Sequence, residues 1–157
     1  MTSVGAVLLM TIAFAARSPV VADTTEYRFA VARRGCTQED APALEIYLTQ
    51  RQFAGVGQPP IPHIRIELAW TDWVRLTDTT LTLAPLSRRG LKRNQPLVRA
   101  ELNRAEHEQE WLTGTLVLRR IECQDVVEGS YDFAEPGDRR LRGTFSAKWV
   151  AGTGGCG

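Results

Sequence analysis

The chain has 157 residues, of which 43% are hydrophobic and 24% charged, with 19 Lys and Arg against 18 Asp and Glu. This length and apolar content suit one folded domain and exclude a disordered chain. The balanced charge excludes a dedicated nucleic-acid-binding protein, and three cysteines are too few for a disulfide-dense scaffold.

Residues 4–16 form an uncharged apolar run that is typical of a secretory signal peptide and shorter than the ~20 residues that cross a bilayer. Cleavage after Ala15 or Ala22 is possible, and the polar sequence from Asp23 onward favours Ala22. We therefore expect a signal peptide over 1–22 and an exported β-domain over 23–157, secreted or periplasmic, with no membrane span after cleavage. The competing interpretation is a buried helix or an uncleaved anchor.

Apolar and polar residues alternate with a period of two through most of the remaining chain, which predicts half-buried β-strands. On this pattern, the apolar residues face the core and the polar residues face water. The segments that show it are 27–32, 44–49, 64–70, 80–84 and 98–102.

Three glycines in the last third each begin the same pattern, in which a hydroxyl residue and then two alternate apolar residues follow. Residues 135–138 (Glu-Pro-Gly-Asp) are a strong turn signal between the second and third copies. We therefore predict that 126–133 and 141–150 pair antiparallel. The residues expected on the buried face of this hairpin are Tyr131, Phe133, Phe145 and Trp149.

About eight strands at turn-bounded intervals indicate an all-β, single-domain fold. We expect an antiparallel β-sandwich that ends in a C-terminal meander, with a small β-barrel as the alternative. The longest irregular stretch, 51–62, contains two Gly and three Pro and is expected to be a surface loop.

The three cysteines all follow the predicted signal peptide, so an oxidising compartment favours one disulfide and one free thiol. We expect Cys36 to pair with Cys156, which would fix a Gly-rich tail, and Cys123 to remain free. Pairing of Cys123 with Cys156 is the alternative.

Trp70 and Trp73 are the candidate ligand-binding residues, because two exposed indole rings at this spacing could stack on sugar rings. The competing interpretation places Trp70 in the core, on the face of its own strand. Residues 87–94 hold four basic side chains, which could contact an acidic partner but are more typical of a solvated loop.

Acidic and histidine side chains gather in two short segments. Residues 106–110 contain three glutamates and His107, yet alternation along a strand separates them, so a polar hairpin tip is favoured over a metal site. Residues 37–40 match a helix-capping pattern that favours a single helical turn. We expect no catalytic residue, metal or cofactor, because no nucleophile, zinc, phosphate-loop or dinucleotide motif occurs.

These observations favour an exported, non-enzymatic β-domain that binds an unknown protein partner or extracellular ligand, and no nucleic acid. The first alternative is a small secreted hydrolase with carboxylate catalysis. Its candidate acids are Glu39, Asp40, Asp72 and Asp78, without any spacing that brings them together. The second alternative is a structural domain of the cell envelope.

Overall fold

The computed structural model describes residues 26–36, 42–69, 73–83 and 96–151. These residues form β-strands and one short 3-10 helix, η1 (Trp73–Leu76), which confirms the all-β prediction. The strands are β1 (Phe29–Cys36), β2 (Pro42–Thr49), β3 (His63–Ala69), β4 (Thr79–Thr82), β5 (Leu97–Ala105), β6 (Glu108–Trp111), β7 (Thr113–Glu122), β8 (Val126–Ala134) and β9 (Arg140–Val150).

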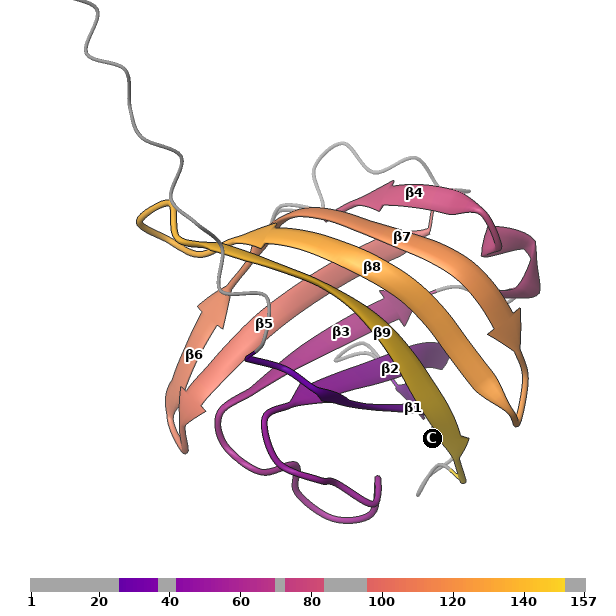
Figure 1. Cartoon of the computed structure of the whole chain (residues 1–157), viewed down its shortest axis with the longest axis horizontal. Coiled ribbons are helices and arrows are strands. Elements are labelled where there is room, and N and C mark those ends of the chain that lie inside the picture. Colours follow the sequence, from indigo (N-terminus) through magenta and orange to yellow (C-terminus); the bar gives the residue numbers. More distant parts are fainter. Residues whose placement is uncertain (1–25, 37–41, 70–72, 84–95, 152–157) are drawn as a thin grey trace, which may run out of the picture.

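All nine strands belong to one mixed sheet in the order β4-β7-β8-β9-β1-β2-β3-β5-β6 (Figure 1). Neighbouring strands are antiparallel except β1 and β9, which run parallel. A single residue, Leu112, joins β6 to β7, and its N–H donates to the carbonyl of Ala100 on β5 across 2.9 Å. β6, the last strand in this order, therefore continues directly into β7, the second strand, and the sheet curls back on itself.

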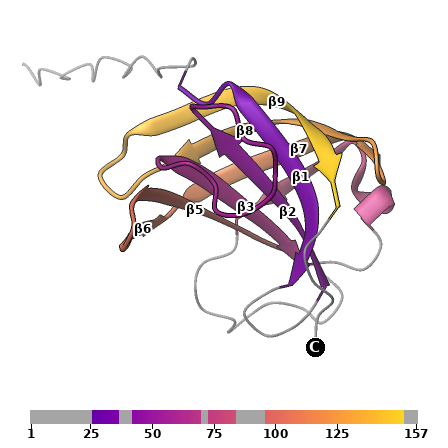
Figure 2. The same ribbon diagram turned by 90° about the horizontal axis from the view of Figure 1, so that it is seen from below.

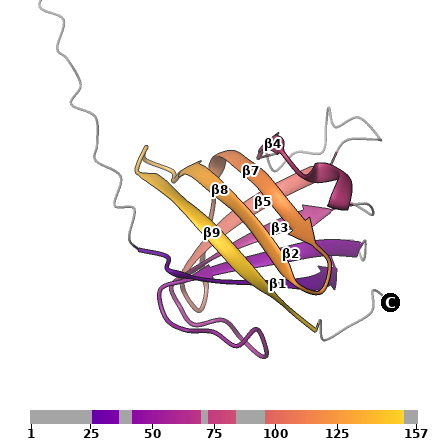
Figure 3. The ribbon, with the colours of Figure 1, turned by 45° about the vertical axis from the view of Figure 1, so that its right-hand side comes forward.

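This arrangement corrects the prediction of an antiparallel β-sandwich, because a sandwich needs two separate sheets and the described strands form one mixed sheet. The curled sheet forms a half-barrel, which agrees with the alternative prediction of a small β-barrel. Figure 3 shows β7, β8 and β9 crossing over β5, β3 and β2. The predicted C-terminal meander is confirmed as β7-β8-β9.

The three patterned glycines each stand opposite an aromatic residue on a neighbouring strand, and Gly143 of β9 pairs with Tyr131 of β8. Gly114 pairs with Phe133 of β8, and Gly129 pairs with Phe145 of β9. A Cβ on Gly129 would lie 2.8 Å from the Phe145 ring, so the missing side chain leaves room for that ring. Cross-strand pairs of glycine and an aromatic residue therefore explain the pattern and favour the strong bend of the strands.

The core lies inside the curl and is built from alternate residues of every strand except β6. On β1 the predicted faces are corrected, because Ala32 lies in the core and Phe29 is 40% exposed. The register of the predicted hairpin is confirmed from Val126 opposite Lys148 to Ala134 opposite Arg140. Its aromatic residues Tyr131, Phe133 and Phe145 are buried, whereas Trp149 is half-buried. Within the described residues, no helix is long and apolar enough to cross a membrane.

Candidate functional site

Several residues singled out from the sequence lie outside the described part of the chain. Trp70 is among them, and Trp73 is described only as the first residue of η1, so the sugar-binding prediction is not tested. The basic segment 87–94, the capping segment 37–40 and Asp72 also lie outside it, as does the signal peptide.

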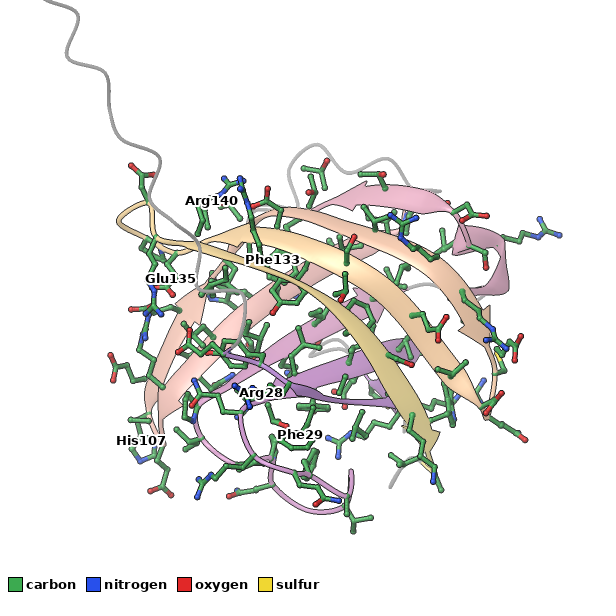
Figure 4. All side chains as sticks on the ribbon, viewed as in Figure 1. Arg28, Phe29, His107, Phe133, Glu135 and Arg140 are labelled. Atoms are coloured by element: carbon green, nitrogen blue, oxygen red, sulfur yellow. The ribbon has the colours of Figure 1, made fainter. Side chains whose placement is uncertain are left out.

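The acidic hairpin is a polar tip, as expected from its alternation. Glu106 and His107 form the exposed turn between β5 and β6, and Figure 4 shows His107 at the end of the molecule. Glu110 is held by Arg104, 3.3 Å away. In the described ranges, no group of three or more His, Cys, Asp or Glu side chains could hold a metal ion. Asp78 is an exposed turn residue.

The cysteines are described in part. Cys123 lies exposed in the β7–β8 turn and is unbonded. Cys36, the last residue of β1, is disulfide-bonded, and its predicted partner Cys156 lies outside the described residues. The pairing of these two residues therefore stays a prediction.

A cluster of charged residues covers the outer face of β1, β2, β3 and β5, and we call it the ionic cluster. One row across the sheet reads Arg33, Glu45, Glu67 and Arg99 in register. The next row contains Tyr47, Arg65 and Glu101. The alternation over 44–49, 64–70 and 98–102 predicted that Glu45, Glu67, Arg99 and Glu101 face water, yet all four are buried. Burial is possible because each of the three glutamates has an arginine within 4.0 Å.

Arg65 is the centre of the ionic cluster. Its Nη2 lies 2.5 Å from Glu45 Oε1 and 3.2 Å from Glu67 Oε2, and its Nη1 lies 3.4 Å from Glu101 Oε1. Arg33 donates through Nε to Glu45 Oε2 across 2.8 Å and through Nη2 to the Tyr47 hydroxyl across 2.7 Å. These bonds join four neighbouring strands.

The ionic cluster shifts the protonation of its own members. Burial raises the pKa of Glu45, but the hydrogen bond from Arg33 and the charge of Arg65 outweigh it, so the pKa is lowered. Burial and the charge of Glu45 together raise the pKa of Tyr47 to about 12. Burial lowers the pKa of the neighbouring His63.

The ionic cluster leaves little room for a ligand. The cavity among Arg65, Glu67, Arg99, Glu101 and Trp111 has a volume of about 10 Å³, which is about the space of one water molecule. Three arginines also face three glutamates, so the charges are balanced. We interpret the cluster as structural.

A second group of charges closes one end of the curl, where Figure 4 shows Glu135 and Arg140. Glu135, in the β8–β9 turn, is buried and forms an ion pair with Arg104 of β5, while Arg139 lies 2.8 Å from Glu26 at the start of the chain's described part. Burial and the nearby charge of Glu26 raise the pKa of Tyr27. These contacts join the β8–β9 turn to β5 and to the segment that precedes β1.

A hollow with a volume of about 400 Å³ lies where the start of β1 meets β7, β8 and β9 in the described structure. This volume falls in the range of small-ligand sites, roughly 300–1,000 Å³. Figure 1 and Figure 2 show the beginning of β1 diverging from β9. The lining residues are Tyr27, Arg28, Ala30, Arg119, Glu128, Gly129, Thr144, Phe145 and Ser146.

The lining combines apolar and polar groups. Phe145, Ala30 and Gly129 supply an apolar part that is continuous with the core. Arg28, Arg119 and Glu128 supply charge, and the Ser146 hydroxyl donates to Glu128 Oε1 across 3.2 Å. Such a lining can hold an amphipathic ligand. No histidine or cysteine lines the hollow, so its described residues include no familiar pair of nucleophile and base.

Sequence reasoning missed this hollow because its lining residues come from the start of β1 and from β7, β8 and β9, which lie far apart along the chain and form no motif. Comparison with known proteins finds no matching family, no matching curated protein and no matching solved structure.

Proposed function

We propose that the chain is an exported, non-enzymatic binding module whose ligand occupies the hollow lined by the start of β1 and by β7, β8 and β9. The observation that carries this proposal is the hollow itself, which combines ligand-sized volume, an apolar part around Phe145 and a charged rim. Binding sites of this kind hold a ligand by apolar contact and fix its orientation through a few polar groups.

The lining favours binding over hydrolysis. A carboxylate-dependent hydrolase of the common type uses two acids several ångströms apart. Among the residues that line the hollow, Glu128 is the one carboxylate, and it accepts a hydrogen bond from Ser146.

Titration with anilinonaphthalene sulfonate, an anionic aromatic dye, tests the proposal. We expect saturable fluorescence enhancement with the native protein and its loss in Thr144→Trp, because the indole ring would fill the hollow. Arg142→Trp is the matched control, since it places the same ring two residues away on the exposed face of β9 and outside the hollow. Equal enhancement in all three proteins would contradict the proposal.

Export is tested independently by the mass of the protein recovered outside the cytoplasm. The apolar run over 4–16 predicts an N-terminus at Asp23, within a few residues. Recovery of a chain that still begins at Met1 would show that no signal peptide is removed.

A further inference from the structure

The parallel ladder between β1 and β9 is short. It joins Val31 to Lys148, Ala32 to Trp149 and Arg33 to Val150, although β1 has 8 residues and β9 has 11. Continued toward the start of both strands, the same register would set Tyr27 opposite Thr144. Both of these residues line the hollow instead. The hollow therefore stands where the ladder would continue.

The backbone of β9 presents hydrogen-bonding groups to this opening. The N–H of Trp149 donates to the carbonyl of Asp125, on the β8 side, across 2.8 Å. Backbone groups point to alternate sides along a strand, and the β8–β9 register is unbroken back to Arg140. The N–H and C=O groups of Thr144 and Ser146 therefore point toward β1, where no described strand pairs with them.

These repeated backbone groups suit an extended peptide ligand better than a compact small molecule. Two donors and two acceptors repeat along β9 at a spacing of about 7 Å, which is two residues of an extended chain. A peptide that adds to a sheet edge bonds to such groups and places alternate side chains on one face. Here the inward side chain would meet Phe145 and Ala30, which are apolar.

We propose that the hollow binds an extended segment of a partner polypeptide, which pairs with the open edge of β9 at Thr144 and Ser146. The proposal rests on the proposed function and names its ligand class. The bound segment alternates an apolar residue, directed at Phe145, with polar residues that face outward. The outward residues are polar, because the rim of the hollow carries charged side chains of both signs, Arg119 and Glu128.

Hydrogen exchange of the free, full-length protein tests the open edge first. We expect fast exchange at the Thr144 and Ser146 amides and slow exchange at Phe145, which points to Gly129 in the β8–β9 ladder. Slow exchange at Thr144 and Ser146 in the free monomer would overturn the proposal, because the chain itself would then occupy the edge.

A phage library of random 12-residue peptides, selected on the same protein, supplies the ligand. We expect enrichment of sequences that alternate apolar and polar residues, and slowed exchange at Thr144 and Ser146 when the best synthetic peptide is bound. N-methylation of the peptide amides that face β9 should weaken binding at least tenfold, whereas methylation of the other edge should not.

Two variants distinguish the contribution of the Ser146 backbone to peptide binding from that of its side chain. Ser146→Ala and Ser146→Pro both remove the hydroxyl, but proline also removes the N–H that faces the hollow. We expect the alanine variant to bind the peptide within about threefold of the native protein and the proline variant about tenfold more weakly. Thermal melts of both variants show whether each is folded, and equal weakening by both would overturn strand pairing at this position.

The remaining outcomes identify other occupants. If the dye binds and Thr144→Trp abolishes its binding, but no peptide is enriched, strand addition is wrong and the proposed function stands. If the dye also fails to bind, the proposed function fails. A dimer that Ser146→Pro dissociates would replace the partner peptide by a second copy of this chain.

Discussion

The hydroxyl of Tyr47 donates a hydrogen bond of 2.9 Å to the carboxylate of Glu45, two residues earlier on the same outward face of β2. Arg33 and Arg65 bind the same carboxylate from the two neighbouring strands. The Glu45 side chain is only 6% exposed, so its charge depends on these partners rather than on water. The outer face of this part of the sheet is thus held by polar contacts as well as by the core beneath it.

Replacing Glu45 by glutamine should destabilise the protein by about 3 kcal/mol, because Arg33 and Arg65 would lose their shared counter-charge. Denaturant unfolding measures this loss. Glu122→Gln removes a carboxylate that is 48% exposed and 2.8 Å from Arg120, and should leave the unfolding midpoint unchanged. Equal effects of the two substitutions would show that Glu45 is not buried among its partners.

The stabilisation by Glu45 should also depend on pH. Its pKa in the folded protein lies below the ordinary value of 4.5, so the stabilisation is complete above that value and is lost as the pH falls below it. The difference in unfolding free energy between the native protein and Glu45→Gln should therefore shrink with acidification. A difference that stays constant between pH 7 and about pH 3 would contradict this account.

The raised pKa values of the three tyrosines predict a loss of stability at alkaline pH. Burial raises the pKa of Tyr47 and Tyr131 to about 12, and that of Tyr27 is raised as well. Because folded tyrosines keep their protons more tightly, the stability that this difference contributes is complete below pH 10 and lost as the pH rises toward 12. Ultraviolet titration of tyrosinate should show no ionisation near pH 10 until the protein unfolds. A component that titrates near pH 10 in the folded state would mean that at least one ring is exposed.

The sequence predicted the local features of this fold well. Alternation over 126–133 and 141–150, with a strong turn signal at Pro136 and Gly137, was sufficient for the hairpin and its register. In a hairpin, the turn fixes which residues pair, so nearby residues carry the information.

Features that depend on distant residues were not predictable in the same way. The parallel pairing of Val31 with Lys148 has no local signal, and it decides both the single curled sheet and the position of the hollow. The burial of Glu67 was also missed, because alternation assigns a charged residue to water and carries no information about partners on neighbouring strands. The half-burial of Trp149 follows from its place near the end of β9, where the core ends.

Two glycines with left-handed backbone conformations test the close approach of β7 and β8. Gly114 has φ of 122°, and a Cβ there would lie 2.1 Å from the carbonyl oxygen of Asp132. Gly137 has φ of 103° in the β8–β9 turn, with nothing within 4 Å of its Cβ position. Gly137→Ala should therefore cost about 1 kcal/mol from backbone strain alone, whereas Gly114→Ala should cost clearly more. Thermal melts of the two variants compare these costs directly, and equal melting temperatures would show that β7 and β8 separate at Gly114 without penalty.

Phe133 is the largest fully buried side chain in the described structure, and it tests the register of the C-terminal meander. It lies opposite Gly114 on β7 and Leu141 on β9, and its ring centroid is 5.2 Å from that of Tyr131. Phe133→Ala removes these contacts and leaves a cavity, so we expect a loss of about 3–5 kcal/mol in unfolding free energy.

Lys148→Ala is the matched control on the exposed face of β9, where surface substitutions change stability by less than about 0.5 kcal/mol. Both variants are compared by denaturant unfolding with the same slope, so that a change in midpoint reports stability alone. A slip of one residue between β8 and β9 would exchange the two faces of β9, taking Lys148 into the core and the aromatic Phe145 out of it. A larger loss for Lys148→Ala than for Phe133→Ala would therefore mean that the β8–β9 register is wrong. The positions of Thr144 and Ser146 beside the hollow depend on that same register. This pair of variants therefore also tests whether these two residues lie where the proposed peptide would bind.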